Sequence, residues 1–111
     1  MDKLNRYRDT IKQVIEDYAG WFPRNDEVQT EIVVDADHDH YELIRVGWKD
    51  ECRVHHSVIH FDIVNGKIWI QQDSTNRPVA NALLEAGIPH EDIVLGFQPP
   101  EARRYTEFAA A

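Results

Sequence analysis

The residues that most constrain the fold are Asn65 and Gly66, which join two runs of alternating apolar and polar residues in VIHFDIVNGKIWIQQD (58–73). An Asn-Gly pair favours a type I′ turn, because both central residues of that turn need a positive φ. The pattern therefore predicts a β-hairpin with a two-residue turn. The expected cross-strand pairs are Val64–Lys67, Ile63–Ile68, Asp62–Trp69, Phe61–Ile70, His60–Gln71, Ile59–Gln72 and Val58–Asp73.

This register gives the predicted hairpin two unlike faces. The apolar residues, which we expect in the core, are Ile59, Phe61, Ile63, Ile68 and Ile70. The residues of the other face, where we expect any partner-interaction surface on the hairpin, are His60, Asp62, Trp69, Gln71 and Asp73. A slip of one residue would exchange the two faces, so the apolar pattern specifies the register strongly.

Upstream of the hairpin, the apolar period changes from helical to extended. Apolar residues spaced three and four apart predict a helix that starts near Asp2 and stops near Gly20. Alternation then predicts three strands, at 28–35, 41–48 and 52–64. We expect a bulge or a close backbone approach at Gly47 and a bend near His55-His56.

Downstream of the hairpin, the pattern returns to helix. We expect a cap from Ser74, Thr75 or Asn76 and an end at Gly87. A short turn at 89–92, a brief strand or extended segment at 93–97 and a helical turn opened by Pro99-Pro100 complete the chain. The order predicts one α+β domain over residues 1–111, a four-stranded antiparallel meander with the N-terminal helix and a second helix packed on one face.

The charge balance disfavours direct nucleic-acid binding. Twenty acidic residues outnumber twelve basic ones, for a net charge of −8, and no basic tract stands out. Phosphate backbones are bound through clustered Lys and Arg, so a protein partner is the better expectation. The single cysteine and the lack of a long apolar run favour a cytoplasmic location with no membrane segment.

Metal-binding and catalytic motifs are incomplete. Asp35-x-Asp37-x-Asp39 suggests a calcium loop, but its sixth and twelfth positions are not Gly and Glu. The pairs His38/His40 and His56/His60 each share a strand face, yet neither brings enough ligands for a closed zinc site. Cys52 lacks a nucleophile motif, and no known enzyme signature occurs. We therefore expect no metal, no cofactor and no catalytic residue.

Two tryptophans, Trp48 and Trp69, lie on predicted strands. Aromatic residues on an open sheet can stack on bases, but such sites have basic surroundings. Trp69 instead neighbours Asp62, Gln71 and Asp73. Packing in the core or at a subunit interface is therefore the preferred interpretation.

Nearly the whole chain resembles one protein family. The resemblance lies in DHYELIRVGWKDECRVHHSVIHFDIVNGKIWIQQD (39–73), ALLEAGIPHEDIVLGFQPP (82–100) and EARRYTEFAAA (101–111). The most specific elements are Val46-Gly47-Trp48, Arg53-Val54-His55, the segment 65–73 and the ending Arg103…Thr106…Phe108-Ala109. These stretches are similar to XisI, the fdxN element excision controlling factor family. His56-Ser57 and Ala110 depart from the family pattern.

The resemblance implies a regulatory rather than a catalytic role. XisI-like proteins are associated with programmed excision of a DNA element by a site-specific recombinase during heterocyst differentiation in cyanobacteria. Their expected companion is a nuclease-like protein, XisH, and we also expect a homodimer that covers exposed strand edges. Two alternatives stay open: an antitoxin-like neutraliser of a nuclease-like partner, and a small ligand-binding domain that uses the face around His60, Asp62, Trp69 and Gln71.

Overall fold

The computed structural model describes residues 2–23 and 27–111. In chain order, its elements are α1 (Lys3–Ala19), β1 (Val28–Asp35), β2 (His40–Lys49), β3 (Cys52–Val64), β4 (Lys67–Asp73), α2 (Val79–Glu85), the 3₁₀ turn η1 (His90–Asp92), β5 (Ile93–Leu95) and α3 (Pro100–Arg103). In the described part of the chain, no helix is both long enough and apolar enough to cross a membrane.

The sheet has five strands in the order β1-β2-β3-β4-β5. The first four form the expected antiparallel meander, whereas β5 pairs with β4 in parallel. A parallel neighbour needs a crossover, and α2 supplies it between β4 and β5. The meander is therefore confirmed, but the sheet has one more strand than predicted, because three residues are too few for a clear period.

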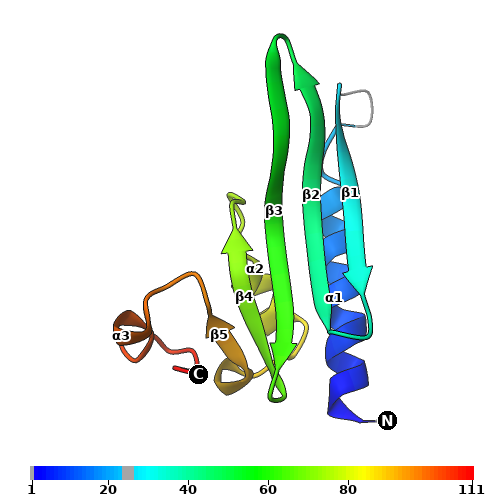
Figure 1. Ribbon diagram of the computed structural model, residues 1–111. Coiled ribbons are helices and arrows are strands. Elements are labelled where there is room, and N and C mark those ends of the chain that lie inside the picture. Colours follow the sequence, from blue (N-terminus) through cyan, green and yellow to red (C-terminus); the bar gives the residue numbers. More distant parts are fainter. Residues whose placement is uncertain (1, 24–26) are drawn as a thin grey trace.

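Both longer helices cover the same face of the sheet (Figure 1). Asp2 caps α1, since its Oδ1 accepts a hydrogen bond of 2.8 Å from the backbone N–H of Asn5. Side chains spaced three and four apart turn one stripe of α1 toward the sheet, and the buried ones are Tyr7, Ile11, Val14, Ile15 and Tyr18. The predicted N-terminal helix and its apolar stripe are confirmed.

The Asn65-Gly66 turn forms as predicted. Both residues have positive φ, 53° and 77°, as a type I′ turn requires. The predicted register holds for the four pairs nearest the turn, from Val64–Lys67 to Phe61–Ile70. Beyond them it shifts by one residue, so that His60 faces Gln72 and Ile59 faces Asp73, with Gln71 as the extra residue. The predicted pairs His60–Gln71, Ile59–Gln72 and Val58–Asp73 are therefore wrong.

A second register shift lies between β2 and β3. Leu43 faces Ile59 while the next residue, Ile44, faces Ser57, which leaves Val58 as an extra residue in β3. Val58 and Ile59 are both buried, so the inward positions of β3 change from even to odd numbers at this bulge. The irregularity predicted near His55-His56 lies at Val58 instead.

Two other sequence signals have clear structural outcomes. A Cβ on Gly47 would lie 2.5 Å from the carbonyl oxygen of Glu27, which confirms a close backbone approach. The predicted cap of α2 is wrong, because Asp73 takes that role: its Oδ2 accepts 2.9 Å from the N–H of Val79. Gly87, with φ 96°, follows the end of α2 as predicted.

The core lies between the helices and the sheet. Its fully buried members include Tyr41 and Leu43 of β2, Ile59 and Phe61 of β3, and Ile68 and Ile70 of β4. Of the five residues expected inside the hairpin, Ile63 alone is only partly buried. The covered face therefore fixes which side chains of the same strands point the other way.

Candidate functional site

The sheet face opposite α1 and α2, which we call the open face, carries a compact group of polar side chains. Its central members come from β2 and β3, and they are His40, Glu42, His60 and Asp62, which we call the His–Asp cluster. Cross-strand pairing places His40 opposite Asp62 and Glu42 opposite His60, and paired residues share a face. The four side chains are between 23% and 34% exposed.

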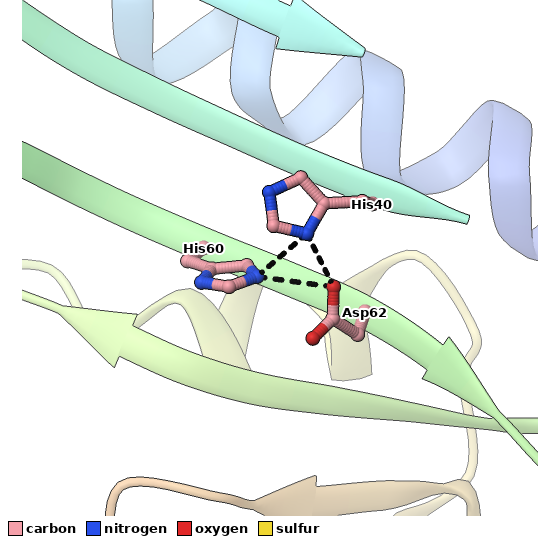
Figure 2. Close-up of side chains that lie close together, drawn as sticks. All are labelled: His40, His60 and Asp62. Carbon is pink, nitrogen blue, oxygen red and sulfur yellow. Dashed lines mark hydrogen bonds and ion pairs between the residues drawn. The ribbon is translucent and has the colours of Figure 1, made fainter. Parts of the chain in front are cut away.

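Three ligand-type atoms of the cluster converge, as Figure 2 shows. His40 Nδ1 lies 2.9 Å from Asp62 Oδ1, and His60 Nε2 lies 3.0 Å from the same oxygen. The two ring nitrogens are 3.1 Å apart. In the described part of the chain this is the one group of three or more His, Cys, Asp or Glu side chains with ligand atoms close enough to hold a metal ion.

Two further side chains orient this triangle. Glu42 Oε2 lies 3.0 Å from His40 Nε2, and its Oε1 lies 4.0 Å from His60 Nδ1. The amide of Gln71 donates to Asp62 Oδ2 at 3.3 Å, which leaves Oδ1 directed at the two imidazoles. Hydrogen bonds thus hold His40 and Asp62 from their far sides, whereas the far nitrogen of His60 lies near Glu42 without a hydrogen bond to it.

The carboxylates shift the protonation of the cluster. The hydrogen bond to Glu42 raises the pKa of His40; partial burial opposes this rise, and Asp62 adds to it. Burial acts against the charge of Glu42, but hydrogen bonds, the strongest from His40, outweigh it and lower the pKa of Glu42. With no other ligand bound, His40 is therefore biased toward imidazolium and Glu42 toward carboxylate.

Comparison with known proteins settles the family. The sequence matches the XisI protein family over residues 1–110. The chain belongs to the XisI family. Among curated proteins, none matches it.

Two solved structures of XisI proteins from Anabaena variabilis have the same fold. One is a XisI-like protein, 38% identical, with a TM-score of 0.92. The other is the fdxN element excision controlling factor XisI, 41% identical, with a TM-score of 0.88. Each match covers 99% of this chain and 100% of the other. The α+β fold predicted from the sequence patterns is thereby confirmed.

In this XisI-family chain, four of the five predicted interaction residues lie together and one does not. His60, Asp62 and Gln71 belong to or contact the His–Asp cluster, and Trp69 pairs directly with Asp62. Asp73 pairs with the core residue Ile59 and accepts hydrogen bonds from Thr75 in the loop that follows it and from Val79 at the start of α2. The bulge at Gln71 therefore removes Asp73 from the face on which the sequence pattern had placed it.

The tryptophans have different surroundings. Trp69 is half-buried, with the guanidinium of Arg103 5.0 Å from its ring centre. Trp48 lies near the far end of the β2–β3 hairpin and is 54% exposed, with Arg53 5.4 Å from its ring. Core packing is therefore wrong for Trp48, and an interface role for it stays a prediction.

The sequence pattern did not reveal that His40 joins His60. Neither predicted pair forms: His38 contacts Asp35 in the β1–β2 turn, while His56 lies on the opposite face from His60 because of the bulge. A signal for the bulge was present. Counting back from the turn at 50–51 would place polar His40 opposite apolar Phe61, and one extra residue in β3 removes that conflict.

Proposed function

We propose that this chain is a non-catalytic accessory factor that controls excision of a DNA element by a site-specific recombinase, and that it acts through a XisH-like protein partner. Its membership of the XisI family supports the excision role, because one solved relative is an fdxN element excision controlling factor. The acidic balance of the chain favours contacts with protein over direct contacts with DNA.

The open face is the observation that carries a role in protein binding. In the described part of the chain, the helices cover one side of the sheet (Figure 1), and the strands carry exposed apolar residues on the other side, at separate positions along the open face. These are Val33, Trp48 and Val64, which are 38%, 54% and 42% exposed. Exposed tryptophan beside polar groups is typical of residues that contribute most to protein–protein affinity.

Co-purification with a XisH-like protein tests this proposal. We expect a complex at micromolar concentration, and we expect Trp48→Ala to weaken it at least about tenfold. Trp21→Ala is the matched control, because Trp21 is 55% exposed and also lies against an arginine, Arg77, but it follows α1 on the covered side. Failure to form a complex, or equal weakening by both variants, would contradict the proposal.

A growth assay separates control of excision from neutralisation. If this chain is an accessory factor for excision, we expect cells that express the partner alone to grow normally. If the partner alone were toxic and this chain relieved the toxicity, the antitoxin-like alternative would replace the excision role.

We also propose that two copies of the chain associate through β1. This strand has β2 on one side only, and its side chains Ile32, Val33 and Val34 are all exposed. At the opposite end of the sheet, a bridge between Val94 and Ala109 covers β5. Unpaired strand edges attract further strands, and an edge lysine discourages this. We expect a dimer by light scattering and a monomer for Val33→Lys; a monomeric parent chain would contradict the dimer.

A further inference from the structure

We propose that His40, His60 and Asp62 bind one divalent transition-metal ion on the open face. This proposal is independent of the proposed partner surface, because it is argued only from the geometry of the His–Asp cluster. Two imidazoles and one carboxylate suit zinc, cobalt, nickel or ferrous iron better than calcium or magnesium, which prefer oxygen ligands alone.

The distances within the triangle match a shared metal. Two ligand atoms about 2.1 Å from an ion lie roughly 3.0 Å apart at right angles and roughly 3.4 Å apart at the tetrahedral angle. The three observed separations are 2.9, 3.0 and 3.1 Å. They therefore fit three ligands on one face of an octahedron, an arrangement that leaves the other positions open.

The atoms that converge are the ones that carry lone pairs. Without an ion, either both rings donate to the single oxygen Asp62 Oδ1 or one ring donates to the other, because the two ring nitrogens are only 3.1 Å apart. A cation would take the place of the protons between these atoms and bond to all three atoms at once. The free arrangement is thus close to the bound one, and little movement would be needed.

The surrounding side chains have the positions expected around a metal ligand. Metal-bound histidines usually direct their second nitrogen at a carboxylate, which holds the ring and increases its basicity. Glu42 lies 3.0 Å from the second nitrogen of His40 and 4.0 Å from that of His60. Gln71 holds the remaining oxygen of Asp62 at 3.3 Å.

The strands hold the ligands firmly and leave the ion accessible. His40 and Asp62 are direct cross-strand partners, and His60 is two residues from Asp62 on the same strand. Side-chain exposures of 34%, 23% and 23% allow an ion to enter from solvent. Open coordination positions could then take water or a side chain from a bound protein.

Metal titration of the untagged full chain tests the proposal. After treatment with a chelator, the protein is titrated with Zn²⁺ by calorimetry and with Co²⁺ by visible absorption. We expect one equivalent to bind with a dissociation constant of about 1 µM or tighter, and we expect the metal to raise the melting temperature. No binding of either ion at about 100 µM protein would overturn the proposal.

Variants distinguish this site from scattered surface histidines. We expect His60→Gln and Asp62→Asn to weaken binding at least about tenfold, and Glu42→Gln to weaken it roughly 10- to 100-fold. His55→Gln is the matched control, since His55 is an exposed histidine earlier in β3 and pairs with Val46, outside the triangle. Equal affinity of His60→Gln and the parent chain would overturn the site.

The folding of each variant is checked independently. Circular dichroism and the metal-free melting temperature show whether the variant retains the parent fold. If His60→Gln were unfolded, the conservative Glu42→Gln carries the test, because it keeps all three ligands. Unchanged metal affinity of a folded Glu42→Gln would then overturn the proposed arrangement.

Discussion

Neighbouring residues of β3 belong to two very different environments. Ile59 and Phe61 are completely buried under the helices, whereas His60, which lies between them, and Asp62, which follows Phe61, are partly exposed on the open face. On the covered face, side chains are held by close packing and removal from water. On the open face, they are held by hydrogen bonds to each other, as Figure 2 shows.

The difference shows that the arrangement of the His–Asp cluster depends on the packing of the covered face. The covered residues determine the register of β2 against β3, and that register alone brings His40 opposite Asp62. The polar side chains contribute little to this choice, because partly exposed hydrogen bonds and ion pairs add only modest stability. The two faces can therefore be separated by substitution.

The largest expected effect is on the covered face. Phe61→Ala removes a fully buried ring and leaves a cavity, so we expect it to lower the free energy of unfolding by about 3–5 kcal/mol. His60→Ala, on the same strand, should lower it by less than about 1 kcal/mol. Urea denaturation measures both, and similar losses would mean that the open face also holds the fold together.

The next effect concerns alkaline pH. Burial, helped by the hydrogen bond to Asp92, raises the pKa of Tyr7 to about 12. The folded state therefore keeps this phenol neutral, and its contribution is complete below about pH 10 and is lost as the pH rises toward about 12. We expect the stability of the parent chain to fall in this window, and Tyr7→Phe to remove up to about 2 kcal/mol of that fall.

Urea denaturation at a series of pH values checks the alkaline effect. The stability of Tyr7→Phe should still fall partly at alkaline pH, because burial also raises the pKa of Tyr41 to about 12. Tyr105→Phe is the control, since Tyr105 is 78% exposed. If Tyr7→Phe and its control had the same pH slope, the buried phenol would not be the cause.

A smaller effect tests the residue that changes faces. Asp73 accepts hydrogen bonds from the backbone of Thr75 and Val79 at 2.9 Å each, so we expect Asp73→Ala to cost about 1–2 kcal/mol. Gln72→Ala, at the neighbouring exposed position, should change stability by no more than about 0.5 kcal/mol. Thermal unfolding compares the two variants. Equal losses of stability would mean that the hydrogen bonds of Asp73 to the backbone do not stabilise the fold.

The smallest effect is expected at Gln71. Its amide bonds to a carboxylate that is itself partly exposed, so Gln71→Ala should lower the free energy of unfolding by about 0.5 kcal/mol or less. Chemical denaturation in triplicate resolves a difference of that size from the effect of Phe61→Ala. A loss comparable to that of Asp73→Ala would show that the hydrogen bonds of the open face stabilise the sheet.

Local signals in the sequence predicted much of the fold. Asn65-Gly66 predicted its turn and the four nearest pairs, and the stripe of α1 predicted the buried side of that helix. Both depend on residues close together in the chain. The parallel strand β5 was only partly predicted, because its pairing with β4 depends on the crossover through α2.

The candidate site was harder to predict, for a physical reason. His40 and His60 are far apart in the sequence, and two bulges decide which side chains share their face. A bulge adds one residue without changing composition or charge, so alternation alone misplaced Asp73 and paired His56 with His60. Three of the predicted residues still lie in or against the cluster, because His60, Asp62 and Gln71 follow the open side of the hairpin.

The extra residue Val58 also determines which changes of length β3 can accept. At the hairpin tip, Lys49 and Cys52 are paired, so one residue can be lost from each strand there and the hairpin is merely shortened. Deleting Val58 alone would remove the bulge, but Ile59 would still face Leu43 and Ser57 would still face Ile44, so both halves of β3 would keep their faces and the core would lose one buried valine. In an alignment of relatives, a single gap at Val58 would therefore indicate a strand without the bulge and with one core side chain fewer, whereas paired gaps at the tip would indicate only a shorter hairpin.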